Sequence, residues 1–479
     1  MVGRTKEIQR LKEIYNSKKA EFVAVYGRRR VGKTFLINEI FKGKYTFRHT
    51  GLSPIEMDDM SVESPKRKQL KAFYNSLILF GMKKSRCPDN WLDAFLMLEM
   101  FLESKDTGKR QLVFFDELPW MDTQKSGFVT AFESFWNGWG CYHNNLMVII
   151  CGSATSWISD KLINNHGGLY NRLTCELKLY PFSLKECEEF FRSKKVKMSR
   201  YDIIQSYMIA GGIPYYLDYF ERGNSLAQNV DQLFFANDAY LKYEYDRLFS
   251  SVFANPEKIK AIVGFLSTKN IGFTRTEICQ NTDGSTGGGL SDALKALQAS
   301  DFIIRYTPFG EKKEEYYKLV DPFCIFYNRF VKNREELEDT FWQQNVVAPP
   351  VNSWRGFAFE NVCLNHIGQI KDALGISGVS TKQSVWTKKS DEDGGFQIDL
   401  LIERKDNVLN MCEAKYFNKE FIVTKNYYET LVDRQEMLEK NVKRGMVVHN
   451  ILITTYGLKY NEYSGIFDRV VTLDDLFCS

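Results

Sequence analysis

The sequence predicts an α/β protein of several domains, and three kinds of pattern carry this prediction. Continuous apolar runs of strand length end in Gly, Asp-Glu or Gly-Ser, which is typical of buried parallel strands that deliver functional side chains. Amphipathic helical patterns separate these runs. A further αβ segment near the C-terminus carries acidic residues inside strand patterns. A chain of 479 residues can hold roughly three or four domains, each with a core of its own.

The first apolar run, 22–26, leads into the loop G-R-R-R-V-G-K-T and then into an apolar helix. This is the context that a phosphate-binding P-loop requires. The glycines allow close backbone approach, and the loop N–H groups and the helix N-terminus would point at phosphate. The lysine would neutralise phosphate charge and the threonine would ligate Mg²⁺, whereas the alternative is a chance glycine turn. The predicted nucleotide-binding residues are Gly27, Arg28, Arg29, Arg30, Val31, Gly32, Lys33 and Thr34.

A second strand-like stretch, 111–117, has four apolar residues (112–115) followed by Asp116 and Glu117. A parallel sheet places such residues at its carboxyl edge, where α/β proteins build their sites. We expect Asp116 to hold the Mg²⁺ shell and Glu117 to orient and polarise the attacking water. A strand that ends in a solvated Asp-Glu turn is the alternative, and the preceding P-loop disfavours it.

Two later residues are candidates for the same site. Ser153 follows the apolar run 146–151, so its hydroxyl is a candidate contact for the γ-phosphate or the catalytic water, although serine is also ordinary in turns. Arg172 is a candidate transition-state cation or interface arginine finger, and a plain surface arginine is the alternative. The strand-like residues 177–182 close this α/β block.

Composition excludes several classes of protein. Hydrophobic residues are 44% and charged residues 26% of the chain, as in ordinary globular proteins. The net charge of +4 argues against a histone-like polycation but permits a local basic face. The ten cysteines include no C-x-x-C pair, which favours reduced thiols over disulfides or a metal site. Because no apolar run approaches a membrane span and no signal-peptide core is present, we expect a cytoplasmic location.

Short motifs that occur in a fixed order carry a family resemblance. They are V-G-R-x-x-E at 2–7, the P-loop, F-D-E-L-P-W at 115–120, G-S-A-T-S at 152–156, L-Y-N-R-L-T at 169–174, L-x-P-F at 179–182 and G-G-I-P at 211–214. In this combination the chain resembles the archaeal ATPase family of AAA+-related, STAND-like P-loop proteins. The resemblance implies a five-stranded parallel ATPase core, a helical lid and a winged helix. The family often has glycine at the position of Asn171, where this chain departs from it.

Residues 184–253 are helical by pattern, apart from the glycines and proline of 211–214. Their aromatic residues have the spacing of a helical core, which we favour over base stacking. From 254 to 345, helices and a hairpin follow in the order of a winged helix. DNA contact and a purely structural role both stay open for this segment. Lys295 is the only basic residue on the expected recognition helix 291–300, whereas Lys312 and Lys313 lie in the wing.

The last segment has an acid on a helix, then D-x(n)-E-x-K on two adjacent strand patterns, 396–402 and 408–416. This arrangement resembles a PD-(D/E)xK nuclease domain. The acids would bind Mg²⁺ through hard oxygens, and the lysine would position or deprotonate water. A catalytically dead nuclease fold used only for binding is the alternative. The residues concerned are Glu360, Asp399, Glu413 and Lys415.

We therefore expect four domains. They are a P-loop core (1–183), a helical lid (184–253), a winged helix with a linker helix (254–345) and a restriction-endonuclease-like α/β domain (346–479), with the prolines near 347–350 as a hinge. The predicted function is an ATPase that uses ATP and Mg²⁺ and is coupled to a DNA-binding, metal-dependent nuclease-like domain. A signalling or scaffold ATPase with an inactive nuclease fold is the alternative. We expect DNA as a partner and no membrane, and a homo-oligomer is compatible with the sequence.

Overall fold

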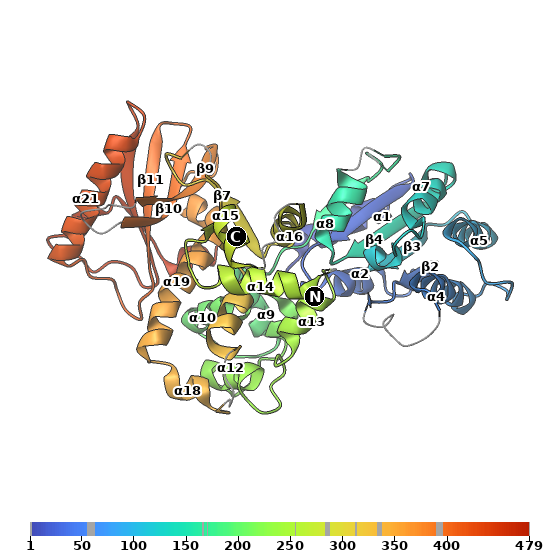
Figure 1. Ribbon diagram of the computed structural model, residues 1–479, viewed down its shortest axis with the longest axis horizontal. Coiled ribbons are helices and arrows are strands. Elements are labelled where there is room, and N and C mark those ends of the chain that lie inside the picture. The colour runs from blue at the N-terminus through green and yellow to red at the C-terminus, as the bar shows by residue number, and fades with distance from the viewer. Residues whose placement is uncertain are drawn as a thin grey trace. The chain divides into compact units, whose positions relative to one another are not determined.

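The computed structural model describes the chain except for residues 1, 55–62, 165–166, 170, 254, 283–287, 312–313, 333–337, 389–395 and 479. The chain divides into two compact units (Figure 1). The first unit comprises residues 1–181, 246–259 and 292–300. The second unit comprises residues 182–245, 260–291 and 301–479.

A five-stranded parallel sheet forms the centre of the first unit, as the sequence predicted. Its order is β2 (Phe47–Thr50), β3 (Gln111–Asp116), β4 (Leu146–Gly152), β1 (Glu21–Tyr26) and β5 (Cys175–Lys178). The last strand was expected over 177–182 but ends at Lys178. Leu179 instead bends over the start of the P-loop, where its N–H donates to the Tyr26 carbonyl over 2.7 Å.

Helices cover this sheet because its apolar strands have side chains on both faces. The core of one face joins Phe22, Phe47 and Phe115 to α4, α5 and α7. The helices of this unit are α1 (Thr5–Tyr15), α2 (Lys33–Phe41), α4 (Pro65–Leu79), α5 (Trp91–Ser104), α6 (Leu118–Met121), α7 (Phe128–Gly138), α8 (Thr155–Ile158) and the π-helical η2 (Ser159–Ile163).

The helical part of the second unit has an aromatic core. Tyr216, Phe234 and Phe235 are fully buried, as their spacing predicted, whereas Tyr240 and Tyr243 are exposed. One expectation was wrong here, because Pro349 and Pro350 open a helix instead of forming a hinge; proline is favoured in the first helical turn, where its missing N–H would have no partner. The helices are α9 (Leu184–Ser193), α10 (Arg200–Ala210), α11 (Pro214–Leu217), α12 (Leu226–Phe234), α17 (Pro322–Phe326), α18 (Phe341–Asn345), α19 (Pro349–Asn365), α20 (Ile367–Ala373) and α22 (Leu473–Leu476).

A small antiparallel sheet of order β6-β8-β7 lies in the second unit. Its strands are β6 (Phe273–Thr274), β7 (Ile303–Tyr306) and β8 (Tyr316–Leu319). Together with α13 (Glu244–Ser250), α14 (Pro256–Leu266), α15 (Arg275–Asn281) and α16 (Gly288–Ala299), they follow the order expected of a winged helix. We call residues 303–319 the hairpin segment. The wing lysines Lys312 and Lys313 lie in it but outside the described residues.

The C-terminal sheet is mixed and has the order β13-β12-β11-β10-β9. Its first three strands along the chain are antiparallel, whereas β11, β12 and β13 are parallel, and α21 (Lys425–Asn441) connects β11 to β12. The strands are β9 (Thr381–Lys388), β10 (Phe396–Arg404), β11 (Val408–Lys415), β12 (Val447–Thr454) and β13 (Arg469–Val471). The sequence analysis did not foresee β9. The α/β multidomain class is confirmed.

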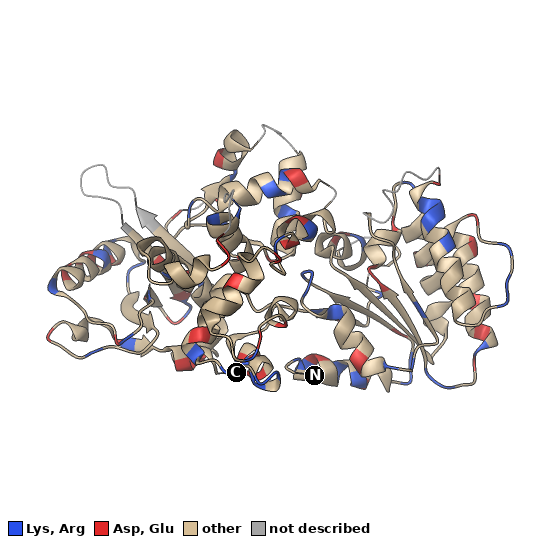
Figure 2. Ribbon diagram, turned by 90° about the horizontal axis from the view of Figure 1, so that it is seen from below, with Lys and Arg blue, Asp and Glu red and all other residues tan. Residues whose placement is uncertain are grey.

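The charged residues of the described chain are mixed in sign along the helices (Figure 2), in keeping with a net charge of only +4. No helix among the described residues is both long and apolar enough to cross a membrane.

Candidate nucleotide site and C-terminal acid centre

The loop between β1 and α2 is folded tightly against the chain that follows β5. Gly27 has φ +140°, and a Cβ there would lie 2.3 Å from the Leu179 carbonyl oxygen, so only glycine fits. Gly32 and Arg30 also have positive φ, at 90° and 73°. The loop therefore holds a conformation that side chains rarely adopt, which is common where backbone N–H groups must face a ligand.

Lys33 is the first residue of α2, and its side chain is only 5% exposed. Its Nζ donates to the carbonyl oxygens of Gly27 and Arg28, each over 2.9 Å, and to Ser153 Oγ over 3.0 Å. These acceptors are all uncharged. The ammonium group therefore lies inside the loop with its full charge available to an anion.

Asp116 ends β3 and accepts a hydrogen bond from Thr34 Oγ1 over 3.0 Å. Burial raises the pKa of Asp116, and the neighbouring Glu117 raises it further, while the Thr34 hydrogen bond lowers it. Arg48 and Lys33 also lower the pKa of Asp116. A hydroxyl and a carboxylate at the carboxyl edge of a parallel sheet are oxygen donors that Mg²⁺ prefers. Thr34 and Asp116 therefore fit a Mg²⁺ ion, which would add positive charge beside the acid.

Glu117 has φ 46°, a left-handed conformation that is uncommon for glutamate. Its two carboxylate oxygens accept from Ser153, one from the backbone N–H over 2.9 Å and the other from Oγ over 2.6 Å. Ser153 Oγ thus donates to Glu117 and accepts from Lys33. The three residues that the sequence selected from separate motifs form one hydrogen-bonded chain.

The remaining predicted residues lie around the same loop. Arg28 and Val31 are buried, and Arg29 is half-buried. Arg4, which the sequence analysis did not select, donates through its guanidinium to the carbonyls of Val31, over 3.3 Å, and Tyr180, over 2.6 Å. Arg4 belongs to the V-G-R-x-x-E motif, so this motif could have indicated that the residue contacts the P-loop.

Arg172 lies on the surface, and within the described part of the chain its side chain makes no hydrogen bond or ion pair. Asn171 before it has φ 55°. Asparagine is among the residues that tolerate this conformation best, so it preserves the backbone geometry that glycine would provide. Asn171 can therefore adopt a conformation that glycine also favours, and the role of Arg172 stays a prediction.

Glu413 in β11 is 1% exposed and already has its own partners. Arg434 Nη1 donates to Oε1 over 2.6 Å, and Tyr427 Oη donates to Oε2 over 2.7 Å. Lys415 Nζ lies 3.3 Å from Oε2, on the same face of the strand as its spacing predicted. The sequence analysis missed both α21 residues, Tyr427 and Arg434.

Glu360 and Asp399 lie near another cation that the sequence analysis missed, Lys318 of β8. Burial raises the pKa of Glu360 to about 8, and Asp399 adds to the shift. Burial likewise raises the pKa of Asp399 to about 6, with a further contribution from Glu413. Burial lowers the pKa of Lys318, and the carboxylates of Glu360 and Asp399 offset part of that effect. We call Glu360, Asp399, Glu413, Lys415 and Lys318 the acid centre.

The acid centre does not fit a divalent ion in this arrangement. In the described part of the chain, no three His, Cys, Asp or Glu side chains are placed to hold a metal ion. The expectation that Glu360, Asp399 and Glu413 would together surround one ion is thus not met. The physical reason is that each acid has another partner, since Asn270 Nδ2 donates to Glu360 and the Ala414 N–H donates to Asp399 over 3.4 Å.

The expected DNA-reading elements are also engaged with protein. Lys295 of α16 forms an ion pair with Asp160 over 2.7 Å, within the first unit. In the second unit the Phe309 N–H of the hairpin segment donates to the Val385 carbonyl of β9 over 3.0 Å. The hairpin segment is thus docked on the edge strand of the C-terminal sheet.

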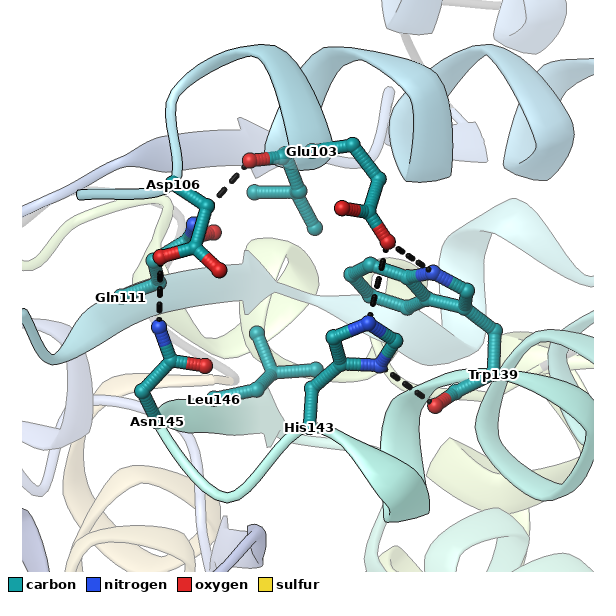
Figure 3. Close-up of a pocket in the computed structure, with 8 residues that line it drawn as sticks. Glu103, Asp106, Gln111, Trp139, His143, Asn145 and Leu146 are labelled. Carbon is teal, nitrogen blue, oxygen red and sulfur yellow. Dashed lines mark hydrogen bonds and ion pairs between the residues drawn. The ribbon is translucent and has the colours of Figure 1, made fainter. Parts of the chain in front are cut away.

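A shallow depression with no room for a water-sized molecule lies where β3 and β4 begin, at the sheet edge opposite the P-loop (Figure 3). Glu103 Oε1 accepts from Trp139 Nε1 and lies by His143 Nε2, both over 3.0 Å. The His143 ring stacks on Trp139 with centroids 3.9 Å apart. These side chains satisfy one another, and we assign them no part in nucleotide chemistry.

Comparison with known proteins finds a family match for the N-terminal part of the chain. Residues 1–220 match a family described as an ATPase domain predominantly from Archaea. The chain is also 26% identical over 443 residues to an uncharacterized protein of Methanocaldococcus jannaschii, covering 91% of this chain and 92% of that protein. The match supports the resemblance of residues 1–220 to an ATPase domain of the archaeal type.

Two solved structures resemble part of this chain at lower sequence identity. The Walker-type ATPase PABY2304 of Pyrococcus abyssi is 18% identical with a TM-score of 0.48, covering 69% of this chain and 96% of that chain. The ORC2 protein of Aeropyrum pernix, in its ADPNP-ADP complexes, is 13% identical with a TM-score of 0.42, covering 68% of this chain and 92% of that chain.

Proposed function

We propose that this protein is an ATP-hydrolysing switch. The observation that carries the proposal is the hydrogen-bonded chain of Lys33, Ser153 and Glu117 beside the Thr34–Asp116 pair. It brings a phosphate counter-charge, a candidate base and two metal-binding oxygens to one edge of one sheet. These are the components that phosphoryl transfer from ATP to water requires.

Each residue has a distinct role in this proposal. Lys33 exchanges neutral carbonyl partners for phosphate oxygens, and the loop N–H groups hold the rest of the phosphate chain. Thr34 and Asp116 hold Mg²⁺, which would neutralise phosphate charge when bound. Glu117 orients a water for attack once Ser153 has released one carboxylate oxygen. Arg172 is exposed and precedes the start of β5, at the sheet edge opposite the P-loop, so in this proposal it supplies transition-state charge to the site of a second copy in a homo-oligomer.

Two substitutions test the ATPase proposal. Lys33→Ala should weaken ATP binding at least about 100-fold, whereas the exposed Lys44→Ala should leave it unchanged. Glu117→Gln should retain binding and lower turnover by about 10²–10⁴-fold, because an amide cannot accept the proton of water. Fluorescent-nucleotide titration and phosphate release measure the two effects. Wild-type turnover in Glu117→Gln would end the assignment.

We further propose that the C-terminal domain is a PD-(D/E)xK-like fold that acts on DNA in the cytoplasm. Asp399, Glu413 and Lys415 lie on two paired strands, as that fold requires, and Glu360 approaches from α19. Arg434 and Lys415 hold Glu413, so cleavage requires that this acid be released first. A basic hollow of about 690 Å³ on α9 and α10 supports a polyanionic partner; its charged rim includes Arg192, Lys195, Lys197 and Arg222.

The alternative is a switch whose C-terminal domain binds a partner without cutting it. The engagement of Glu413 by Arg434 and Tyr427 favours this alternative, because a metal-binding carboxylate needs a free oxygen. Incubation with linear, branched and single-stranded DNA, with Mg²⁺ and with or without ATP, separates the two. Cleavage that disappears in Asp399→Ala and Lys415→Ala, both folded, would establish the nuclease. DNA binding with no cleavage under any condition would establish the alternative.

A further inference from the structure

The basic hollow of about 690 Å³ lies in the second unit, at the connection between α9 and α10. Its volume is within the range of about 300–1,000 Å³ that is typical of pockets for small molecules. The apolar side chains that line it are Phe191, Val196 and Ile203, which are buried, and Met198, which is half-buried. The cations of its rim are exposed. The hollow therefore combines an apolar floor with a positively charged entrance.

Three of the rim cations have no partner within the chain as described. The side chains of Lys195, Lys197 and Arg222 form no hydrogen bond or ion pair among the residues that the structure describes. Lys195 also has φ 59°, just past the end of α9, at a position where glycine or asparagine is usual. A charged side chain thus occupies a position where the backbone favours an uncharged residue, and such strain is common at binding sites.

The acid that lines the hollow, Glu188, is mainly engaged elsewhere. Arg200 Nε donates to Glu188 Oε1 over 2.9 Å, whereas the rim residue Arg192 lies 3.7 Å from Oε2. Among the described residues that line the hollow, Glu188 is the only acid. The rim therefore keeps an excess of positive charge, which an anion from solvent can balance.

We infer that the basic hollow binds a nucleoside phosphate monoester, the group that a DNA strand presents at a phosphorylated end. The inference rests on the proposed binding of DNA and names the part of DNA that this site takes. The rim cations contact the terminal phosphate, and the terminal base lies against the apolar floor.

The charge and the lining of the hollow favour a strand end over the side of a duplex. A terminal phosphate monoester carries up to two negative charges, whereas each phosphate within a strand carries one. Several cations around one hollow match the terminal group better. In a duplex, stacking covers the faces of the bases, so the apolar floor would have no partner there. An unpaired terminal base offers its face to the floor.

The experiment measures binding of the full chain to short single strands by fluorescence anisotropy, in EDTA so that no strand is cut. Every protein carries Lys33→Ala, which removes the phosphate contact of the P-loop. Strands are phosphorylated at the 5′ or the 3′ end and labelled at the other end. The preferred one should bind at least about 10-fold more tightly than the unphosphorylated strand, because charge-assisted contacts to a dianion are strong.

Two matched pairs of substitutions locate the site. Lys195→Asn with Lys197→Met should abolish the preference for the phosphorylated end. Asparagine tolerates the left-handed conformation of residue 195, so the melting temperature should not fall. Lys83→Asn with Lys84→Met makes the same charge change elsewhere on the surface and should keep the preference. Loss of the preference in both pairs would contradict the assignment to the hollow.

The outcomes separate the inference from the proposed function. Equal affinity for phosphorylated and unphosphorylated strands would overturn the inference and leave DNA binding standing. Absence of binding to every strand would overturn both. A phosphorylated strand without its terminal base should bind more weakly than the intact strand, and equal affinity would refute the role of the floor. A free nucleoside monophosphate that competes as well as the strand would assign the hollow to a free nucleotide and overturn the strand end.

Discussion

The nucleotide site and the acid centre both place carboxylates on strands of an α/β fold, but they balance the charge differently. Asp116 and Glu117 accept hydrogen bonds from the hydroxyls of Thr34 and Ser153, while Lys33 donates to neutral oxygens. Glu413 instead lies against Arg434 and Lys415. In the nucleotide site, hydroxyl groups surround the acids, and the balancing cation would arrive with the ligand. In the acid centre, side chains of the chain itself already balance the charge of Glu413, so no ligand is required.

The largest expected effect that tests this contrast is on stability. Arg434→Met leaves Glu413 buried with one cation fewer, which should cost about 3–5 kcal/mol. Asp116→Asn removes a buried acid that makes no ion pair among the described residues and whose pKa burial raises, so it should leave the stability of the nucleotide-free protein unchanged or raise it. Hydrogen–deuterium exchange of β11 and α21, and of β3, measures the two effects locally, with the exposed Arg444→Met as control. Similar losses in both variants would remove the distinction between the sites.

A second expected effect concerns Glu360 and pH. Since the pKa of Glu360 is raised from 4.5 to about 8, its proton stabilises the fold fully below pH 4.5, and this contribution is lost as pH rises toward 8. Glu360→Gln keeps an acceptor for Asn270 but does not titrate. Its melting temperature, measured in EDTA, should therefore exceed that of the wild type by several degrees more at pH 8 than at pH 5, at about 1.4 kcal/mol per pKa unit. A difference that is constant with pH would contradict the burial argument.

Ser153→Ala tests the nucleotide side of the comparison. The variant keeps the backbone N–H bond to Glu117 but removes the hydroxyl that links Glu117 to Lys33. We expect turnover to fall about 10- to 100-fold with ATP affinity little changed, because misplacement of a catalytic group costs this much. Ser104→Ala, on the surface of the same unit, is the control. Unchanged turnover would show that the hydrogen-bonded chain has no catalytic role.

The smallest expected effect is on DNA binding. Lys195→Glu combined with Lys197→Glu should weaken binding about 10-fold at low salt and reduce its salt dependence, without changing sequence preference, because phosphate contacts are electrostatic. Lys83→Glu with Lys84→Glu makes the same charge change elsewhere on the surface. Fluorescence anisotropy over a series of salt concentrations measures both pairs. An equal loss in the two pairs would indicate a non-specific charge effect rather than a basic binding surface.

The same contrast explains how much the sequence could predict. The sequence could predict the P-loop, Asp116, Glu117 and Ser153 because each directly follows an apolar strand. Parallel strands bring their carboxyl ends together at one edge of the sheet. The shared face of Glu413 and Lys415 could be predicted for a similar reason, because side chains two residues apart in a strand point to the same side of the sheet. These are consequences of local pattern.

The partners of the acids could not be predicted in the same way. Lys318 lies in a short strand of an earlier segment, where a lysine is normally solvated, and only tertiary packing brings it to Glu360 and Asp399. Tyr427 and Arg434 are seven residues apart, which places them on one helix face, but nothing in that spacing identifies Glu413 as their target. Arg4 reaches Val31 across 27 positions. Long-range compensation of charge has no local sequence signal.

Metal stoichiometry in the wild type tests the account most directly. Mn²⁺ is titrated into the full chain by electron paramagnetic resonance, with and without a non-hydrolysable ATP analogue. The account predicts one tight site per chain that appears only with the nucleotide and disappears in Asp116→Asn, and no tight site without nucleotide. A tight site that forms without nucleotide and is lost in Asp399→Asn would contradict it, because the acid centre would then lack the internal compensation described for Lys318 and Arg434.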